Sequence, residues 1–233
     1  MATSISAGAK RVALTPVSSV PVPGIPKQAV GVVPIDTVPI DPVPDGPFAR
    51  HVEELAEICR LAATCEHDVA IAADLLADSL AQGGTVFSCG NGGSATDAAH
   101  FTAELVGRMV AERAPLRGVN LAADPAVLTA LGNDYGYDQV FARAVDGIAR
   151  SGDALLGIST SGRSDNVLQA LDAAARRGVA TVLLTGASAT APIAADVVIR
   201  IPSTVTPHIQ ELHTAVIHVL CLEIEARLGL PSS

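Results

Sequence analysis

The sequence predicts an α/β fold of three layers, in which a five-stranded parallel sheet is flanked by helices in the Rossmann-like or flavodoxin-like manner. From about residue 85 onward, short apolar runs of strand length alternate with longer segments of helical periodicity. Hydrophobic residues make up 49% of the 233 residues but aromatic residues only 3%. The core therefore consists of small aliphatic side chains, which suit helices packed on a parallel sheet. Glycine- and serine-rich loops follow two of the expected strands, at the end where parallel sheets bind ligands.

The first 47 residues are set apart by proline, since they hold nine of the fifteen prolines of the chain. Proline at this density is incompatible with helices and central strands. We therefore expect residues 1–47 to form an extended, disordered arm. Residues 48–233 are expected to form a single domain that begins with a helical segment.

The elements of this domain follow in order along the chain. The helical segment runs from Phe48 to Leu80, as one long helix or two shorter ones, and Gly83-Gly84 ends it. A buried strand is expected over 85–89, followed by a glycine-rich turn and a helix over 95–109. Further strands are expected at 118–121, 153–158, 179–184 and 197–201. Further helices are expected at 125–131, at 137–150, from the serine-rich loop to 177, and at 207–228. Strands separated by helices in this way pair in parallel.

The loop after the third strand is predicted to bind a phosphate group. Its sequence is Ser159-Thr160-Ser161-Gly162-Arg163-Ser164, which places four hydroxyl groups within six residues. The glycine lets the backbone turn tightly and direct N–H groups inward, and the following helix adds free N–H groups and the positive end of its dipole. A serine-rich helix cap is the alternative interpretation, but a cap needs only one hydroxyl.

The loop after the first strand is more ambiguous. Its sequence, Gly90-Asn91-Gly92-Gly93-Ser94-Ala95, fits the G-x-G-x-x-A pattern of dinucleotide-binding sites. Those sites also have an acidic residue about 20 positions further on. Asp124 lies about 30 positions on, in a loop. We therefore expect no nucleotide cofactor and disfavour a nicotinamide-dependent enzyme.

Polar side chains on two of the expected helices form a candidate acid–base site. His100 and Glu104 are four residues apart and share a helix face, which Arg108 continues. Gln210 and His218, about two turns apart on the last helix, point broadly the same way. Such residues suit two chemistries that the spacing alone does not separate. One is proton transfer between adjacent carbons of a carbonyl sugar through an enediol, and the other is binding of a divalent metal such as zinc.

Other polar and sulfur-containing residues are interpreted without a functional role. His213 points away from Gln210 and His218 on the same helix, and we expect an ordinary surface residue. The cysteines show no CxxC spacing and lie in apolar stretches, so we expect buried free thiols in a reducing cytoplasm. They are Cys59, Cys65, Cys89 and Cys221.

Composition excludes several classes of partner. The formal net charge of −9 argues against nucleic acid, which requires a basic surface. No apolar run reaches the roughly 18 residues that span a bilayer, and no signal peptide is recognisable. We expect a cytoplasmic protein that binds neither a membrane nor nucleic acid.

The segment from about residue 50 to 228 resembles the sugar isomerase (SIS) domain of the sedoheptulose 7-phosphate isomerases, also called phosphoheptose isomerases. Five motifs carry the resemblance in the family's order. They are Gly90–Ala95, His100–Leu105, Gly132–Tyr137, Gly157–Val167, and Gln210–His213 with Ile217-His218. The proline-rich arm lies outside the resemblance.

The resemblance implies a homotetramer with sites between subunits, and conversion of sedoheptulose 7-phosphate to D-glycero-D-manno-heptose 7-phosphate. By matching positions, it implies that Glu104 and His218 are the acid–base pair. The residues implied to bind substrate are Asn91, Gly92, Gly93, Ser94, Arg108, Asn133, Asp134, Ser159, Thr160, Ser161, Ser164 and Gln210. One zinc ion per subunit is implied on His100, Glu104, Gln210 and His218, as in some family members. We take His218 as the base and Glu104 as the shuttle between oxygens, although the reverse assignment stays open.

Two other functions stay open alongside this one. Some members of the same family bind the replication initiator protein DnaA instead of catalysing, but they lack the full acid–base set, so retention of Glu104 and His218 disfavours that reading. An isomerase of another ketose phosphate is the second alternative, because preference for sugar length depends on the shape of the cleft.

Overall fold

The computed structural model describes residues 45–190 and 192–231. The expected proline-rich arm lies outside the described residues except at its end. From Asp45 onward the chain forms one compact unit, whose first helix begins at Pro47. The predicted start of the domain at residue 48 therefore differs by one residue from the start of this helix.

The sheet has five strands, all parallel, in the order β2-β1-β3-β4-β5. This is the flavodoxin-like strand order, and it confirms the predicted fold class. The strands are β1 (Val86–Gly90), β2 (Gly118–Asn120), β3 (Ala154–Ser159), β4 (Ala180–Gly186) and β5 (Val197–Ile201). Each predicted strand overlaps an observed one, because a short apolar run of strand length marks each of them between segments of helical periodicity.

The helices are α1 (Pro47–Ala62), α2 (Glu66–Ala81), α3 (Gly93–Val106), α4 (Pro125–Tyr135), α5 (Val140–Ile148), α6 (Asp165–Arg176) and α7 (Thr206–Arg227). The first helical segment is thus two helices, joined by a single 3-10 turn. The helix predicted over 95–109 differs from α3 at both ends, since α3 begins two residues earlier and ends three residues earlier, at Val106. Gly107 terminates it with a non-helical backbone, φ −84° and ψ −118°. Among the described residues, no helix is both long and apolar enough to cross a membrane.

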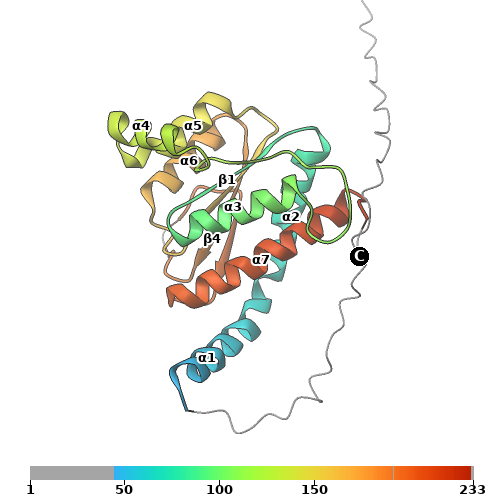
Figure 1. Cartoon of the computed structure of the whole chain (residues 1–233), viewed down its shortest axis with the longest axis vertical. Coiled ribbons are helices and arrows are strands. Elements are labelled where there is room, and N and C mark those ends of the chain that lie inside the picture. The colour runs from blue at the N-terminus through green and yellow to red at the C-terminus, as the bar shows by residue number, and fades with distance from the viewer. Residues whose placement is uncertain (1–44, 191, 232–233) are drawn as a thin grey trace, which may run out of the picture. The chain divides into compact units, whose positions relative to one another are not determined.

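The helices cover the two faces of the sheet in two separate layers (Figure 1). One face packs against α2, α3 and α7, and sheet residues such as Leu156 and Leu184 point to it. The other face packs against α5 and α6, and Leu155 and Leu183 point there. Side chains alternate between the faces along each strand, so both faces carry apolar residues and the sheet is buried between two cores.

The order of the strands places the two candidate loops side by side. Strands β1 and β3 are neighbours, with Gly90 opposite Ile158. From the end of β1 the chain passes to α3 on one face, whereas from the end of β3 it passes to α6 on the other. Such a divergence leaves a crevice at the carboxyl ends of the strands, which is where sheets of this kind bind ligands.

Helix α1 differs from the other elements of the domain. None of its residues is buried, and Phe48 is 80% exposed, with Val52 and Leu61 also exposed. Its contacts include α7 and the 3-10 turn that follows it, and Leu55 and Ile58 rest against the edge of the core. An amphipathic helix with an uncovered apolar stripe is typical of an interface.

All four cysteines are free, and three of them are buried as expected. Burial raises the pKa of Cys89 and of Cys221 to about 12, so both are neutral thiols that pack as small apolar groups. The expectation was wrong for Cys59, which is exposed because α1 has no cover on that side.

Candidate active site

The predicted phosphate loop, residues 159–164, joins β3 to α6. The Ser159 and Ser164 hydroxyl oxygens lie 2.9 Å apart, and the Arg163 backbone N–H donates to the Ser161 hydroxyl at 3.2 Å. Ser164 is the N-cap residue of α6, yet its side chain makes no capping hydrogen bond. The Ser164 hydroxyl is therefore paired with that of Ser159 rather than used as a helix cap, which argues against the capping interpretation.

A left-handed glycine closes this loop. Gly162 has φ +62°, and a Cβ atom there would collide with the side chain of Ala189. The Gly186 N–H, at the end of β4, donates to the Thr160 carbonyl at 3.1 Å. The loop is thus packed against the neighbouring strand end, at the N-terminus of a helix, where backbone N–H groups and the helix dipole favour an anion.

Paired asparagines tie the two loops together. Asn91, after β1, and Asn166, in the first turn of α6, exchange two side-chain hydrogen bonds of 2.8 and 2.9 Å. The Tyr137 hydroxyl also donates to Asn91 Oδ1 at 3.0 Å. Gly92, with φ +55°, makes the tight turn that lets Ser94 N–H bond back to the Asn91 carbonyl at 3.0 Å. Spacing alone did not single out Asn166 and Tyr137, although both lie inside the motifs that carry the resemblance.

Helices α3 and α7 bring the predicted acid–base residues together. His100 Nε2 lies 3.3 Å from Glu104 Oε1 and 3.4 Å from His218 Nε2. The two imidazole rings meet edge to face, with centroids 4.9 Å apart. His100 is close to both other groups, but Glu104, His100 and His218 do not offer three ligand atoms that all lie within 4.8 Å of one another. His100 therefore stands between Glu104 and His218.

Gln210, on α7, lies against the start of α3. A Cβ atom on Gly93 would overlap the Gln210 amide nitrogen, so the absence of one lets α7 approach the start of α3. One turn along each helix, the Thr214 hydroxyl donates to Asp97 Oδ1 at 3.3 Å. Burial raises the pKa of Asp97, with the Thr214 hydrogen bond and nearby His100 acting the other way. Asp97 and Thr214 were not predicted, because neither belongs to a recognisable spacing.

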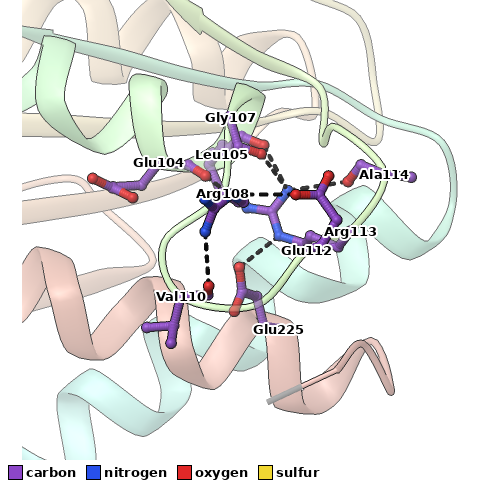
Figure 2. Close-up of polar contacts among 9 residues, drawn as sticks. All are labelled: Glu104, Leu105, Gly107, Arg108, Val110, Glu112, Arg113, Ala114 and Glu225. Atoms are coloured by element: carbon purple, nitrogen blue, oxygen red, sulfur yellow. Dashed lines mark hydrogen bonds and ion pairs between the residues drawn. The ribbon is translucent and has the colours of Figure 1, made fainter. Parts of the chain in front are cut away.

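The end of α3, which carries Glu104, is held by a buried ion pair (Figure 2). Arg113 Nε lies 2.5 Å from Glu225 Oε1, and the two side chains are 1% and 2% exposed. The same guanidinium group donates to the backbone carbonyls of Glu104 at 2.6 Å, Leu105 at 3.0 Å and Gly107 at 3.2 Å. These are the carbonyls that a helix end leaves without partners, so Arg113 fixes the backbone from which Glu104 projects.

Other predicted residues are not drawn into this group. Arg108 lies beyond the end of α3 rather than on its face, where it pairs with Glu112 at 3.3 Å and donates to the Val110 carbonyl (Figure 2). Asn133 and Asp134 are exposed at the end of α4 and bond to each other at 2.7 Å. No hydrogen bond joins these three described residues to the loops or to the histidines.

His213 was wrongly expected at the surface. It is fully buried, and burial lowers its pKa to about 4, while the nearby Thr185 backbone acts the other way. Helical periodicity correctly predicted that His213 points away from Gln210 and His218. It could not predict that the sheet covers that side of α7. His213 is therefore a neutral core imidazole.

Two hollows of the single chain lie away from the histidines. One, of about 740 Å³, lies between β2, α4 and α5, and one of about 510 Å³ lies beside the outer edge of the phosphate loop, at Gly162 and Arg163. Neither is lined by His100, Glu104 or His218.

Comparison with known sequences places the chain among sugar isomerases. A family model described as the SIS domain matches residues 49–186. The chain is 47% identical over 184 residues to a phosphoheptose isomerase of Rhodospirillum rubrum, covering 76% of this chain and 98% of that protein. It is 43% identical over 186 residues to a phosphoheptose isomerase of Helicobacter hepaticus, covering 79% and 93%.

Solved structures agree with the sequence comparison. The phosphoheptose isomerase GmhA from Neisseria gonorrhoeae matches with a TM-score of 0.71 and 38% identity, covering 77% of this chain and 97% of that one. A phosphoheptose isomerase from Francisella tularensis matches with a TM-score of 0.73 and 35% identity, covering 77% and 96%. The fold and most of the chain are thus shared with these proteins.

Proposed function

The chain belongs to the SIS domain family and, within it, to the phosphoheptose isomerases, and we propose that it converts sedoheptulose 7-phosphate to D-glycero-D-manno-heptose 7-phosphate. The observation that carries this proposal is the presence of two groups of residues on one sheet. A loop suited to phosphate follows β3, and an acid–base group of His and Glu lies on α3 and α7, which pack against the same sheet.

The phosphate of the substrate binds to the hydroxyl groups of Ser159, Thr160, Ser161 and Ser164. The N-terminus of α6 adds its backbone N–H groups and dipole. The bond between Ser159 and Ser164 opens when the phosphate arrives, because phosphate oxygens are stronger acceptors than a hydroxyl. In this proposal the sugar also contacts Asn91, Gly92, Gly93, Ser94 and Gln210, of which Gln210 lies against Gly93.

Proton transfer then runs between the first two carbons of the sugar. His218 removes a proton from the carbon next to the carbonyl, which gives an enediol, and returns it to the former carbonyl carbon. Glu104 moves a proton from the oxygen of the first carbon to that of the second. His100, within 3.4 Å of both groups, keeps their side chains in position.

A zinc ion fits the donor set of His100, Glu104, Gln210 and His218, which offers two imidazoles, a carboxylate and an amide oxygen. Neighbouring ligand atoms of a tetrahedral zinc site lie about 3.4 Å apart when the bonds are about 2.1 Å long. The separations of 3.3 and 3.4 Å about His100 Nε2 match that edge, and Glu104 has to swing toward His218 to complete the set. Zinc bound there would polarise the sugar carbonyl.

We further propose a homotetramer with sites completed between subunits. The uncovered apolar face of α1 supports an interface, as do Val219 and Leu222, which are exposed on α7. Three predicted substrate-binding residues lie exposed and away from the histidines of their own subunit, namely Arg108, Asn133 and Asp134. In the tetramer they would contact substrate bound at a neighbouring subunit. Four free cysteines, one of them exposed, support a reducing cytoplasmic location.

The function is tested by removing each acid–base group while keeping its shape. Glu104→Gln and His218→Gln are each expected to lower kcat by about 100-fold or more, since a positioned acid or base contributes about 10²–10⁴-fold. Circular dichroism should show an unchanged fold. His67→Gln, at an exposed position of α2, is the matched control and should keep full activity. Full turnover by either of the first two variants would overturn the mechanism.

The sugar itself is tested with a panel of ketose phosphates of five to seven carbons. The seven-carbon substrate is expected to give the highest kcat/KM, in line with the names of the relatives described above. A preference for a shorter ketose phosphate would keep the reaction and change the substrate. Capture of the initiator protein DnaA, without isomerase activity in the same preparation, would favour the non-catalytic alternative.

A further inference from the structure

A second cluster of histidine and glutamate lies between α1 and α7, apart from the residues assigned to the isomerase. Each helix carries one His-x-x-Glu pair, which sets both side chains on one face. On α1 the pair is His51 and Glu54, and on α7 it is His208 and Glu211. We call these four residues the α1–α7 cluster. About 150 residues of sequence separate the two pairs, and the resemblance to the isomerases gives none of them a role.

The side chains of the cluster converge closely. His51 Nε2 lies 2.7 Å from Glu211 Oε1, and His51 Nδ1 lies 3.2 Å from His208 Nε2. The rings of the two histidines have centroids 4.6 Å apart, and Glu54 Oε2 lies 3.8 Å from His208 Nε2. One ligand atom from each of His51, His208 and Glu211 can be chosen so that all lie within 4.8 Å of one another. This is a closer three-way approach than His100, Glu104 and His218 make.

Burial adds a second, independent observation. The His208 side chain is 2% exposed, and its Nδ1 is buried without a hydrogen-bond partner. A chain of hydrogen bonds from His208 through His51 to Glu211 uses the remaining ring nitrogens but leaves this buried one unsatisfied, which costs free energy. It is Nε2 of His208, and not Nδ1, that faces His51 and Glu54. What the cluster offers a ligand is therefore a nearly buried imidazole beside a second imidazole and two carboxylates.

We propose that the α1–α7 cluster binds one divalent transition-metal ion of the zinc class through His51, His208 and Glu211. Imidazole and carboxylate are ligands that zinc accepts in tetrahedral sites. Glu54, exposed and nearby, or a water molecule occupies the fourth position. With one ligand atom taken from each residue, the three atoms lie within 4.8 Å of one another. The edge of a tetrahedral site is about 3.4 Å, so rotation of the side chains has to bring these atoms closer together to form the site.

The ion would fasten α1 to the body of the domain. None of the sixteen residues of α1 is buried, so its position depends on few apolar contacts. Cross-linking α1 to α7 would fix the angle at which its apolar face is presented to another subunit. This role is structural and separate from proton transfer at Glu104 and His218.

The test uses the full chain in a background that lacks both histidines of the isomerase group, His100→Ala with His218→Ala. After dialysis against a chelator, Co²⁺ is titrated as a probe, since tetrahedral Co²⁺ absorbs visible light, and Zn²⁺ is then used to displace it. We expect one Co²⁺ per chain and a rise of Tm with Zn²⁺, as for any ligand of the native state.

Adding His51→Gln or Glu211→Gln to this background should weaken binding by more than about tenfold, because even second-shell partners of metal ligands are worth that much. His67→Gln, an exposed histidine of α2, should leave affinity unchanged. His51 is partly exposed, so its variant folds, and circular dichroism checks this. In the otherwise wild-type chain, His51→Gln should lower the number of bound ions by one. Absence of Co²⁺ binding in the background, or equal affinity with and without His51→Gln, would overturn the proposal and leave a hydrogen-bonded cluster only.

Discussion

Single hydroxyl groups of the phosphate loop are expected to act on binding rather than on stability. Ser164 makes its hydrogen bond to Ser159 and none to the backbone of α6, so Ser164→Ala removes no helix cap. The loss of one hydrogen bond to a charged group costs about 1.5–3 kcal/mol, which raises KM by roughly 10- to 100-fold while kcat changes little. Steady-state kinetics with the sugar phosphate measures both. Ser151→Ala, at an exposed turn before β3, should leave KM as it is, and an unchanged KM in Ser164→Ala would exclude Ser164 from the phosphate site.

His213 makes stability depend on pH in a window that can be predicted. Burial lowers its pKa from 6.5 to about 4, so between these values the unfolded chain binds a proton that the native chain does not. The neutral His213 therefore adds up to about 3 kcal/mol to the free energy of unfolding above pH 6.5, and this contribution is lost as the pH falls toward 4. Urea unfolding across this range should give a steeper loss in the wild type than in His213→Gln, which does not titrate. Equal pH dependence in the two proteins would show that His213 is solvated.

At the residue scale, sequence reasoning found the residues with recognisable spacing and missed those placed by tertiary packing. His100, Glu104 and His218 came from helical periodicity and do meet. Asp97 could not be found, because its partner Thr214 lies on another helix. The depth of burial of His213 depends on how closely α7 approaches the sheet, which no local pattern records.

The end of α3 depends on a guanidinium group that comes from the next loop. Arg113→Met should destabilise the protein by about 3–5 kcal/mol, because it leaves the buried carboxylate of Glu225 uncompensated. Replacing both partners, Arg113→Met with Glu225→Leu, should recover part of this loss, although the Glu104 carbonyl loses the donor that Arg113 supplies. Urea denaturation measures all three.

The control for this pair is exposed. Arg176→Ala breaks an ion pair with Asp172 on the surface of α6 and should cost less than about 1 kcal/mol. If Arg113→Met cost no more than Arg176→Ala, the buried pair would not be what secures α3. The folded fraction of Arg113→Met should also turn over more slowly, since Glu104 projects from the backbone that Arg113 holds.

Strands were easier to predict than the ends of helices. Short apolar runs of strand length between segments of helical periodicity located each of the five strands, and their parallel pairing followed from the helices between them. The end of α3 was placed three residues too late, because local propensity permits a helix through Arg108 and Met109. It ends at Val106 because Gly107 departs from helical geometry and Arg113 takes up the free carbonyls, and the second of these causes is not local.

Assembly of the whole molecule is expected to depend on α1. Phe48→Ser with Val52→Ser removes apolar surface from a helix that already lacks cover, so the monomer should fold but associate less well. Light scattering over a range of concentrations should give a lower mass than for the wild type. Ile148→Ser, which changes an exposed apolar residue at the end of α5, is the control. A monomeric wild type, or a loss of mass with Ile148→Ser alone, would contradict an interface through α1.

The last helix carries Gln210 and His218, whereas the sheet and the serine-rich loop are complete by Ile201. Domains fold as units, and α7 supplies Ile209, Ile217 and Ile224 to the core on one face of the sheet. A growing chain therefore cannot bury that face before α7 has left the ribosome. A stable fold and catalytic competence are acquired together, late in synthesis, when the final helix docks beside α3, and truncation before residue 206 is expected to abolish both.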